Sequence, residues 1–212
     1  MARQRAELAV AQSRLLGLDP VLDGLVERHG PCRLPGPTPG PRRFEELVES
    51  IAYQQLHGNA AAKIWSRVVE AAGGGISPEA LLTAGFDELR ACGLSGAKTR
   101  SMLDLSERAA DGRLRLTRIG RLSDEAVIDE LIPAWGVGRW TAQMFLMFTL
   151  GRLDVWPAGD YGVRNGFGVA WGHTEMPTEK QMAALGDPFA GARSLVAWYC
   201  WRAADTAGGR SQ

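Results

Sequence analysis

Cysteine is scarce in this chain of 212 residues, which contains only three. Cys32, Cys92 and Cys200 are far apart and odd in number, so they outline neither a disulfide framework nor a metal-ligand spacing. In particular, the chain lacks a four-cysteine run of the kind that holds an iron–sulfur cluster. We therefore expect a protein of a reducing compartment that contains no iron–sulfur cluster and requires no cofactor.

The chain also lacks an excess of either charge, because 24 lysines and arginines balance 24 acidic residues. Proteins that bind polyanions broadly usually carry a positive excess. The balance therefore argues against non-specific binding of nucleic acid but leaves room for a compact basic face. Charge is in fact unevenly spread, since residues 98–121 contain seven basic and three acidic side chains, and residues 123–131 contain four acids and no base.

Long apolar runs are absent as well, and no stretch reaches the roughly 18 residues that a membrane-spanning helix needs. The segment Met1–Arg5 opens the chain without the apolar stretch that is typical of a signal peptide. From these features we expect a soluble, cytoplasmic protein that makes no contact with a membrane. We also expect it to be a monomer.

The sequence shows no convincing series of alternating strands, whereas helical periodicity recurs along it. Phe44, Leu47, Val48 and Ile51, for example, follow the i, i+3, i+4, i+7 spacing of a one-sided helix. We predict an all-α fold in which residues 1–212 form one unit of two helical lobes. Its expected parts are an N-terminal helix (about 20–29) and Pro/Gly-rich linker within 1–43, helices near 44–55, 60–72, 78–85, 86–92 and 95–111, a hairpin at about 124–151, and helices near 160–170, 178–185 and 189–204.

The turn Gly136-Val137-Gly138 joins the two helices of the predicted hairpin. Glycine tolerates the positive φ that such a turn demands and lets the backbone approach a ligand closely. The following helix begins with free N–H groups and a positive dipole end, which suits one DNA phosphate. Taken alone, a Gly-x-Gly turn is more typical of an ordinary corner between helices, but the longer pattern around it favours the phosphate site.

An aspartate follows this turn after about twenty residues, within the segment Gly151–Val163 (GRLDVWPAGDYGV). The hairpin and this segment together resemble the helix-hairpin-helix superfamily of base-excision glycosylases, and within it the 3-methyladenine DNA glycosylase II branch. Three further stretches are similar to that branch, namely Phe44–Ile64, Leu89–Lys98 and Ala192–Arg202. The order and spacing of these motifs make a chance match improbable.

The resemblance implies that Asp160 is the catalytic carboxylate. Cleavage of a base–sugar bond builds positive charge on the sugar, and a carboxylate stabilises that charge and orients or deprotonates the attacking water. An isolated aspartate before a helix would more often be an N-cap. Asp154 is the rival carboxylate, and we expect it to fix its loop by local hydrogen bonds instead.

Trp140 stands where bifunctional relatives carry the lysine that forms a Schiff base with the sugar. Tryptophan cannot form this bond, so the resemblance implies base removal without strand cleavage. The Trp140 ring could also stack on a flipped, positively charged alkylpurine, or it could simply be a core side chain. Candidates for the base pocket are Trp140, Met144, Tyr53 and Trp156, although each of the last three, taken alone, is more typical of a core side chain.

The predicted contacts with DNA fall into three groups. Gln54, Gln55, Leu56 and His57 lie at the wedge position of the family, where Gln55 or Leu56 would fill the gap left by a flipped nucleotide. The hairpin residues Gly136, Val137 and Gly138 would face a phosphate. Lys98 and Arg139 are candidate phosphate neighbours, with a solvated surface role as the alternative. In relatives such a hairpin holds a sodium or potassium ion, for which the backbone of Trp135 and Val137 is the candidate here.

These inferences predict a monofunctional DNA glycosylase that releases alkylated purines of the 3-methyladenine and 7-methylguanine type from duplex DNA in base excision repair. The alternatives are a non-catalytic protein that binds damaged DNA, and a glycosylase for oxidised or mismatched bases. We expect the short, two-lobed form of the fold without the N-terminal α+β domain of larger relatives. The sequence Asp160-Tyr161-Gly162 replaces the more frequent Asp-Leu-Gly, which leaves the substrate range open.

Overall fold

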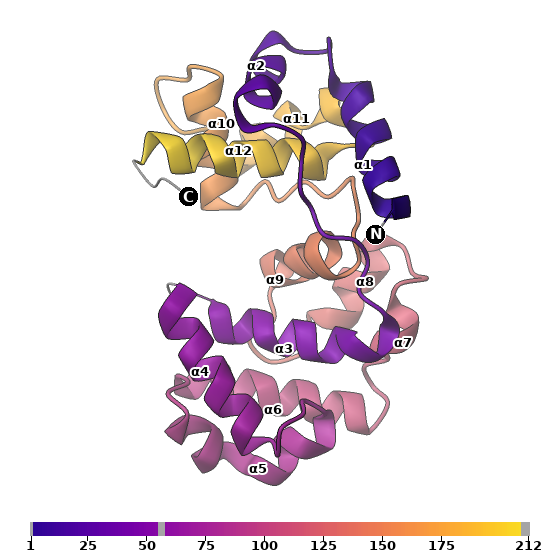
Figure 1. The fold of residues 1–212 in the computed structure, drawn as a ribbon, viewed down its shortest axis with the longest axis vertical. Helices are drawn as coiled ribbons and strands as arrows, with labels where there is room; N and C mark the ends of the chain where they lie inside the picture. The colour runs from indigo at the N-terminus through magenta and orange to yellow at the C-terminus, as the bar shows by residue number, and fades with distance from the viewer. Residues whose placement is uncertain (1, 55–57, 209–212) are drawn as a thin grey trace. The chain divides into compact units, whose positions relative to one another are not determined.

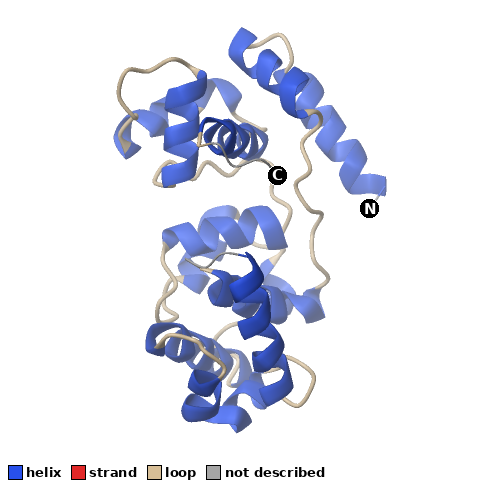
Figure 2. Ribbon diagram, turned by 60° about the vertical axis from the view of Figure 1, so that its left-hand side comes forward, coloured by secondary structure: helices blue, strands red, loops and turns tan. Residues whose placement is uncertain are grey.

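The computed structural model describes residues 2–54 and 58–208, and in this part of the chain every regular element is a helix (Figures 1 and 2). The predicted all-α fold is therefore confirmed for the described residues. The α-helices are α1 (Ala2–Leu15), α2 (Pro20–His29), α3 (Arg43–Tyr53), α4 (Gly58–Ala71), α5 (Pro78–Ala91), α6 (Gly96–Ala110), α7 (Leu116–Ile119), α8 (Asp124–Leu131), α9 (Arg139–Met144), α10 (Tyr161–Ala170), α11 (Glu179–Leu185) and α12 (Arg193–Ala207). Two 3₁₀ turns, η1 (Gly40–Arg42) and η3 (Asp187–Phe189), and a π-helical turn, η2 (Phe145–Thr149), complete the set.

The chain divides into two compact units. Unit 1 is built from the two ends of the sequence, Met1–Pro37 and Leu146–Gln212, and unit 2 is the continuous segment Thr38–Phe145. The hairpin helices α8 and α9 therefore lie in unit 2, whereas the segment with the predicted catalytic aspartate lies in unit 1.

Unit 1 joins the N-terminal residues to the C-terminal helices through specific hydrogen bonds. The hydroxyl of Tyr199 on α12 donates to the Gly30 carbonyl at 3.0 Å and lies 3.1 Å from Oε1 of Gln12. The Trp171 indole donates to Asp19 at 3.0 Å, and the same aspartate caps α2. The sequence pattern predicted one helix and a Pro/Gly-rich linker within residues 1–43. In the structure, residues 2–37 belong to unit 1, and they contain a further helix, α1, which was not predicted.

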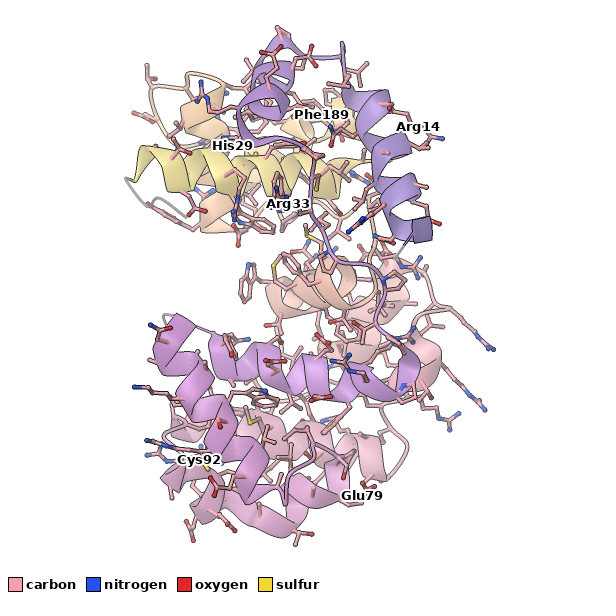
Figure 3. The ribbon with its side chains drawn as sticks, viewed as in Figure 1. Arg14, His29, Arg33, Glu79, Cys92 and Phe189 are labelled. Atoms are coloured by element: carbon pink, nitrogen blue, oxygen red, sulfur yellow. The ribbon has the colours of Figure 1, made fainter. Side chains whose placement is uncertain are left out.

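In unit 1, charged side chains lie mostly at the surface and apolar side chains fill the interior. Figure 3 shows Arg14 pointing away from α1, whereas Phe189 lies among the helices of the unit, where it is 3% exposed. Phe189 also packs edge-on against Trp171, with ring centroids 6.1 Å apart. The apolar side chains that α12 contributes to this core lie along most of its length, as expected for a central helix.

Unit 2 is a bundle whose helices start where capping residues predict. Ser77 accepts the N–H of Ala80 ahead of Pro78, and Ser95 accepts the N–H of Lys98 at the start of α6. The two short helices expected on either side of Gly85 form one element, α5, with a break at Gly85, whose φ is 73°. Glycine adopts this left-handed value without strain. Despite the break, α5 packs along α6.

The closest helix packing in unit 1 is between α10 and α12. A Cβ atom added to Gly166 would overlap the carbonyl oxygen of Cys200. No rotamer change can relieve such a clash, because both partners are backbone atoms. The two helices can therefore pack at this distance only if residue 166 is glycine.

We predict that Gly166→Ala destabilises the protein by about 3 kcal/mol, the upper part of the usual range for overpacking. Urea unfolding would measure this free energy. Gly24→Ala is the matched control, because Gly24 is also a helical glycine of unit 1 but has no atom within 4 Å of its added Cβ. There, alanine should raise the stability by up to about 1 kcal/mol through its higher helix propensity. Equal effects of the two substitutions would contradict the packing argument.

Candidate functional site

The predicted hairpin is present in unit 2, where a short turn connects α8 to α9. Gly136 has a φ of 76°, and an added Cβ there would lie 3.2 Å from Oγ of Ser101. The left-handed φ favours glycine at this position, and the close approach of Ser101 adds to that preference. Val137 is 4% exposed and therefore packs inward, while Gly138 is the extended N-cap of α9. The turn thus presents the backbone of Gly136 and Gly138 at its surface and buries the side chain of Val137.

Asp104 of α6 holds this turn in place through a hydrogen bond. Oδ2 of Asp104 accepts the backbone N–H of Trp135 at 2.7 Å and the Nε–H of Arg108 at 2.7 Å. Burial opposes ionisation of Asp104, but these two hydrogen bonds outweigh it and hold the pKa of the carboxyl below its usual range. The position of the turn is therefore coupled to α6, which the sequence motif alone did not reveal.

Arg139, the first residue of α9, forms an ion pair with Glu125 of α8, with 2.6 Å between NH2 and Oε1. More than half of each side chain is exposed. Such a surface pair contributes about 0–1 kcal/mol, so an incoming phosphate could replace Glu125 at little cost. The role of Arg139 at a phosphate stays a prediction.

Lys98 belongs to the first turn of α6, and its side chain reaches the end of α3, where the ammonium group donates to the carbonyls of Ala52 at 2.8 Å and Gln54 at 2.6 Å. Desolvation by burial lowers its pKa from the ordinary lysine value. Because these carbonyls belong to the last turn of the helix, Lys98 acts as a C-terminal cap. This role is an addition to the predicted phosphate contact.

The predicted wedge begins directly after this capped helix end. Gln54 donates from Nε2 to Oγ1 of Thr141 at 3.4 Å, which links the end of α3 to α9 of the hairpin. The other wedge candidates, Gln55, Leu56 and His57, lie outside the described residues. Lys98 and Thr141 therefore fix the point from which the wedge segment leaves α3.

The four predicted pocket residues have different environments. Trp140 is 43% exposed on α9, and Tyr53 and Met144 are half-buried in the same unit. Trp156 belongs to unit 1, where it is 9% exposed and its indole donates to the Met182 carbonyl at 2.6 Å. The structure thus assigns Trp156 a place in the core of unit 1, next to α11, and leaves a broad face of Trp140 accessible.

Asp160 is the N-cap of α10 and is 9% exposed. Its Oδ1 atom accepts two N–H groups, the backbone N–H of Val163 at 2.8 Å and the indole N–H of Trp201 at 2.8 Å. The cap role that the sequence raised as an alternative is therefore real. It does not compete with a chemical role, because the same bonds hold the carboxylate in a defined orientation.

Trp201 is the residue of this site that our reading of the sequence missed. It lies on α12, 41 residues beyond Asp160, and its ring stacks on Phe148 with centroids 5.7 Å apart. Its only sequence signal is its place in the Ala192–Arg202 motif, which carries no information about the aspartate that it contacts.

Asp154, the rival carboxylate, has a clear structural partner in Arg193. The two form a bidentate ion pair with 2.7 Å from Nε to Oδ1 and 2.7 Å from NH2 to Oδ2. Burial opposes ionisation, but the bonds with Arg193 outweigh it and lower the pKa of Asp154. Asp154 therefore does hold its loop by hydrogen bonds, but the expectation that these bonds are local is wrong, because Arg193 lies 39 residues further along the chain.

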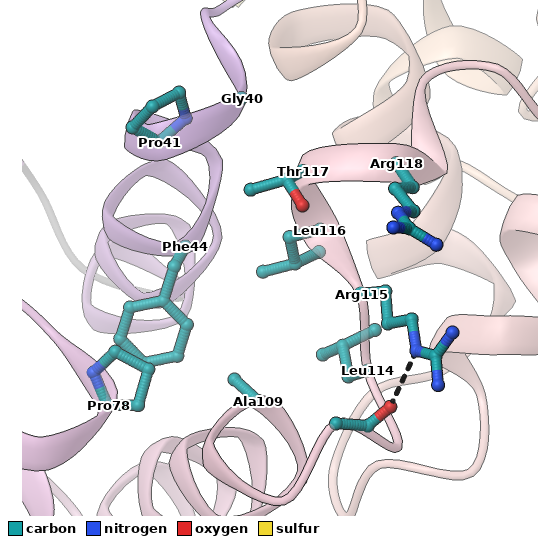
Figure 4. A pocket seen from close by; sticks show the side chains of 11 residues that line it. Gly40, Pro41, Phe44, Pro78, Ala109, Leu114, Arg115, Leu116, Thr117 and Arg118 are labelled. Atoms are coloured by element: carbon teal, nitrogen blue, oxygen red, sulfur yellow. Dashed lines mark hydrogen bonds between the residues drawn. The ribbon is translucent and has the colours of Figure 1, made fainter.

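A cavity of about 430 Å³ lies elsewhere in unit 2 (Figure 4). Phe44, Pro78 and Leu116 form part of its largely apolar wall, and the guanidinium groups of Arg115 and Arg118 turn away from it. Nε of Arg115 donates to the Gly112 carbonyl at 3.1 Å. None of the predicted site residues lines this cavity.

Within residues 2–54 and 58–208, no three His, Cys, Asp or Glu side chains gather as a metal ion would require. None of the helices described there combines the length and the hydropathy that a bilayer crossing needs.

The family of this chain follows from its similarity to known proteins. Residues 48–189, which include the hairpin and the aspartate segment, match the model of the HhH-GPD superfamily base excision DNA repair proteins. The chain belongs to the HhH-GPD superfamily. The resemblance inferred from the sequence motifs is therefore confirmed, and the capped Asp160 and the Gly136 turn are features of an HhH-GPD protein.

Relatives within the superfamily carry a consistent description. DNA-3-methyladenine glycosylase 1 of Schizosaccharomyces pombe is 34% identical over 198 residues, covering 92% of this chain and 87% of the relative. The solved structure of S. pombe 3-methyladenine DNA glycosylase Mag1 in complex with abasic DNA matches with a TM-score of 0.81 and 34% identity over 91% of this chain and 95% of that chain. DNA-3-methyladenine glycosidase from Bacillus halodurans matches with a TM-score of 0.81 and 33% identity, covering 94% and 91%.

We predict that Asp154→Asn lowers the thermal stability of this HhH-GPD protein in a pH-dependent way. The folded-state pKa of Asp154 lies below its unfolded value, so the carboxylate contributes stability above the unfolded pKa and loses it as the pH falls through the folded pKa. The difference in Tm between wild type and variant should be full at pH 7 and shrink below about pH 4. A difference that stays constant throughout the acid range would contradict this assignment.

Proposed function

We propose that this protein is a monofunctional DNA glycosylase that hydrolyses the N-glycosidic bond of alkylated purines in duplex DNA, with Asp160 as its catalytic carboxylate. The observation that carries the proposal is the buried Asp160 carboxylate, oriented by two N–H donors, in a chain 34% identical to a DNA-3-methyladenine glycosylase. The substrate class is that of 3-methyladenine and 7-methylguanine. These bases leave readily because alkylation gives them a positive charge.

The main contribution that the reaction requires from the protein is one fixed negative charge near the sugar. As the bond to the base lengthens, the sugar acquires oxocarbenium character. A carboxylate held in one orientation stabilises this charge without having to reorganise, and it can accept a proton from the attacking water. The cationic base departs as a neutral molecule, so no strong general acid is needed. Asp160 meets the requirement for orientation, since two N–H groups hold Oδ1.

The hairpin is proposed to bind the DNA backbone. Its turn exposes main chain at Gly136 and Gly138, and the inward packing of Val137 and the bond from Trp135 to Asp104 stiffen it. A stiff turn loses little conformational entropy when it contacts a phosphate. The proposed partner is therefore double-stranded DNA that contains alkylated bases, with the protein acting as a monomer.

The sodium or potassium ion that the family resemblance implies is proposed to bind at the same turn. Ser101 is 3% exposed, its Oγ faces Gly136, and this oxygen has no hydrogen-bond partner within the described part of the chain. A buried oxygen without a hydrogen-bond partner is compatible with a nearby ion that oxygen ligands hold. We propose the backbone of Trp135 and Val137 as its site. The ion would stiffen the turn and has no part in the bond cleavage.

Asp160→Asn should reduce the single-turnover release of 3-methyladenine and 7-methylguanine from methylated duplex DNA by at least about 100-fold, because the negative charge opposite the oxocarbenium is lost. Asp154→Asn is the matched control, since it makes the same chemical change in the same loop. Its rate should stay within twofold of wild type at a temperature where both variants are folded. Undiminished release by Asp160→Asn would refute the assignment of Asp160, and no release by wild type would refute the enzyme.

We further predict base release without strand cleavage. Trp140 supplies no amine for a Schiff base, so the abasic product should keep an intact backbone until alkali or heat is applied. Denaturing gels of end-labelled duplex, with and without alkali, would measure this. Borohydride trapping should give no covalent complex with DNA. Nicking of the untreated product would contradict the argument from Trp140.

A further inference from the structure

The two hydrogen bonds to Asp160 have different origins. The bond from Val163 is the local one that any helix N-cap makes with the residue three positions later. The bond from Trp201 arrives from α12, and its 2.8 Å length equals that of the local bond. A cap needs only the first bond, so the second is additional to what the start of α10 requires.

The surroundings of Trp201 are shaped to bring its indole to the carboxylate. A Cβ atom on Gly162 would lie 2.8 Å from Cδ1 of Trp201 and 3.2 Å from Oδ1 of Asp160. Only glycine therefore leaves room for the indole edge beside the first turn of α10. Phe148 stacks on the same ring at an interplanar angle of 29°. The hydrogen bond, the glycine and the stacked ring together fix the indole in one position.

We propose that Trp201 is the positioning residue of the catalytic carboxylate, a statement that rests on the proposed function. Its N–H and that of Val163 reach the same oxygen from separate elements, so the carboxylate cannot turn without breaking one of them. The indole donor also replaces part of the water that a buried carboxylate gives up. Trp201 acts on the reaction through Asp160, by presenting the carboxylate to the sugar in one orientation.

A purely structural role is the competing explanation, and the same unit contains an internal comparison for it. Trp171 donates its indole N–H to Asp19 at 3.0 Å, and Asp19 is the N-cap of α2. Its ring stacks on Phe167 with centroids 4.1 Å apart. Trp171–Asp19 therefore repeats the arrangement of Trp201–Asp160, with an indole, a capping aspartate and a stacked phenylalanine, at an aspartate for which no chemistry is proposed.

The test compares Trp201→Phe with Trp171→Phe in the full chain. Each variant keeps an aromatic ring for stacking and loses one indole donor to a capping aspartate. We expect both to lower Tm by similar amounts. Trp201→Phe alone should reduce the single-turnover rate of 7-methylguanine release by about 10- to 100-fold, the usual effect of a misplaced catalytic group. Its Kd for duplex DNA with a tetrahydrofuran abasic analogue should stay within twofold of wild type.

Gly162→Ala provides a second variant that keeps both Trp201 and Asp160 but displaces the indole. It should show the same slow base release with unchanged DNA affinity. A spectroscopic signature tests the hydrogen bond itself. In ¹⁵N–¹H spectra, the indole cross-peak that disappears in Trp201→Phe should shift strongly in Asp160→Ala, whereas the cross-peak lost in Trp171→Phe should not.

The outcomes separate the positioning role from the proposed function. If the wild type releases no base, the proposed function fails, whatever Trp201 does. If Asp160→Asn releases bases at the wild-type rate, the catalytic assignment of Asp160 fails, and the positioning role of Trp201 fails with it. If Asp160→Asn is inactive but Trp201→Phe and Gly162→Ala are as fast as Trp171→Phe, the positioning role alone is overturned. A matching loss of DNA affinity and rate in Trp201→Phe would also overturn it, because a structural defect predicts that result. An indole cross-peak that is insensitive to Asp160→Ala would show that the bond does not form in solution.

Discussion

The burial of one carboxylate is the constraint on which the rest of unit 1 depends. A buried carboxylate must find N–H donors in place of water. Asp160 finds one in its own helix and one in α12, which places α12 within hydrogen-bond distance of the start of α10. That proximity in turn requires glycine at two positions of α10, because Gly162 makes room for the indole and Gly166 for the backbone of Cys200.

The same dependence explains why the two ends of the sequence share one unit. Helix α12 carries Trp201 toward Asp160, and its Tyr199 hydroxyl is bonded to Gly30 and Gln12 in the N-terminal segment. At the start of α12, Arg193 holds the loop that leads to Asp160 through its ion pair with Asp154. One helix therefore orders both the approach to Asp160 and the N-terminal segment.

In unit 2, neighbouring side chains hold the exposed backbone of the hairpin turn in place. Its turn at Gly136 packs only one side chain, that of Val137, and Asp104 holds the turn further by accepting the N–H of Trp135. Lys98 does the same for the end of α3 by capping two carbonyls. Charged residues that a sequence pattern marks as DNA contacts can thus also hold the backbone that would meet the DNA.

Residue pattern and spacing by themselves determined the helical class, most helix positions and the hairpin turn, because these depend on local periodicity, on capping residues and on motifs of short range. The prediction that Asp160 is the catalytic carboxylate came from the family resemblance that these motifs carry. Only the tertiary structure decided the inclusion of residues 1–37 in unit 1, the core position of Trp156, the caps made by Lys98 and the bond from Trp201 to Asp160. Each of these joins residues far apart in the chain. Hydrogen-bond donors act across a few ångströms of space, and no local pattern of residues records which distant side chain will arrive there.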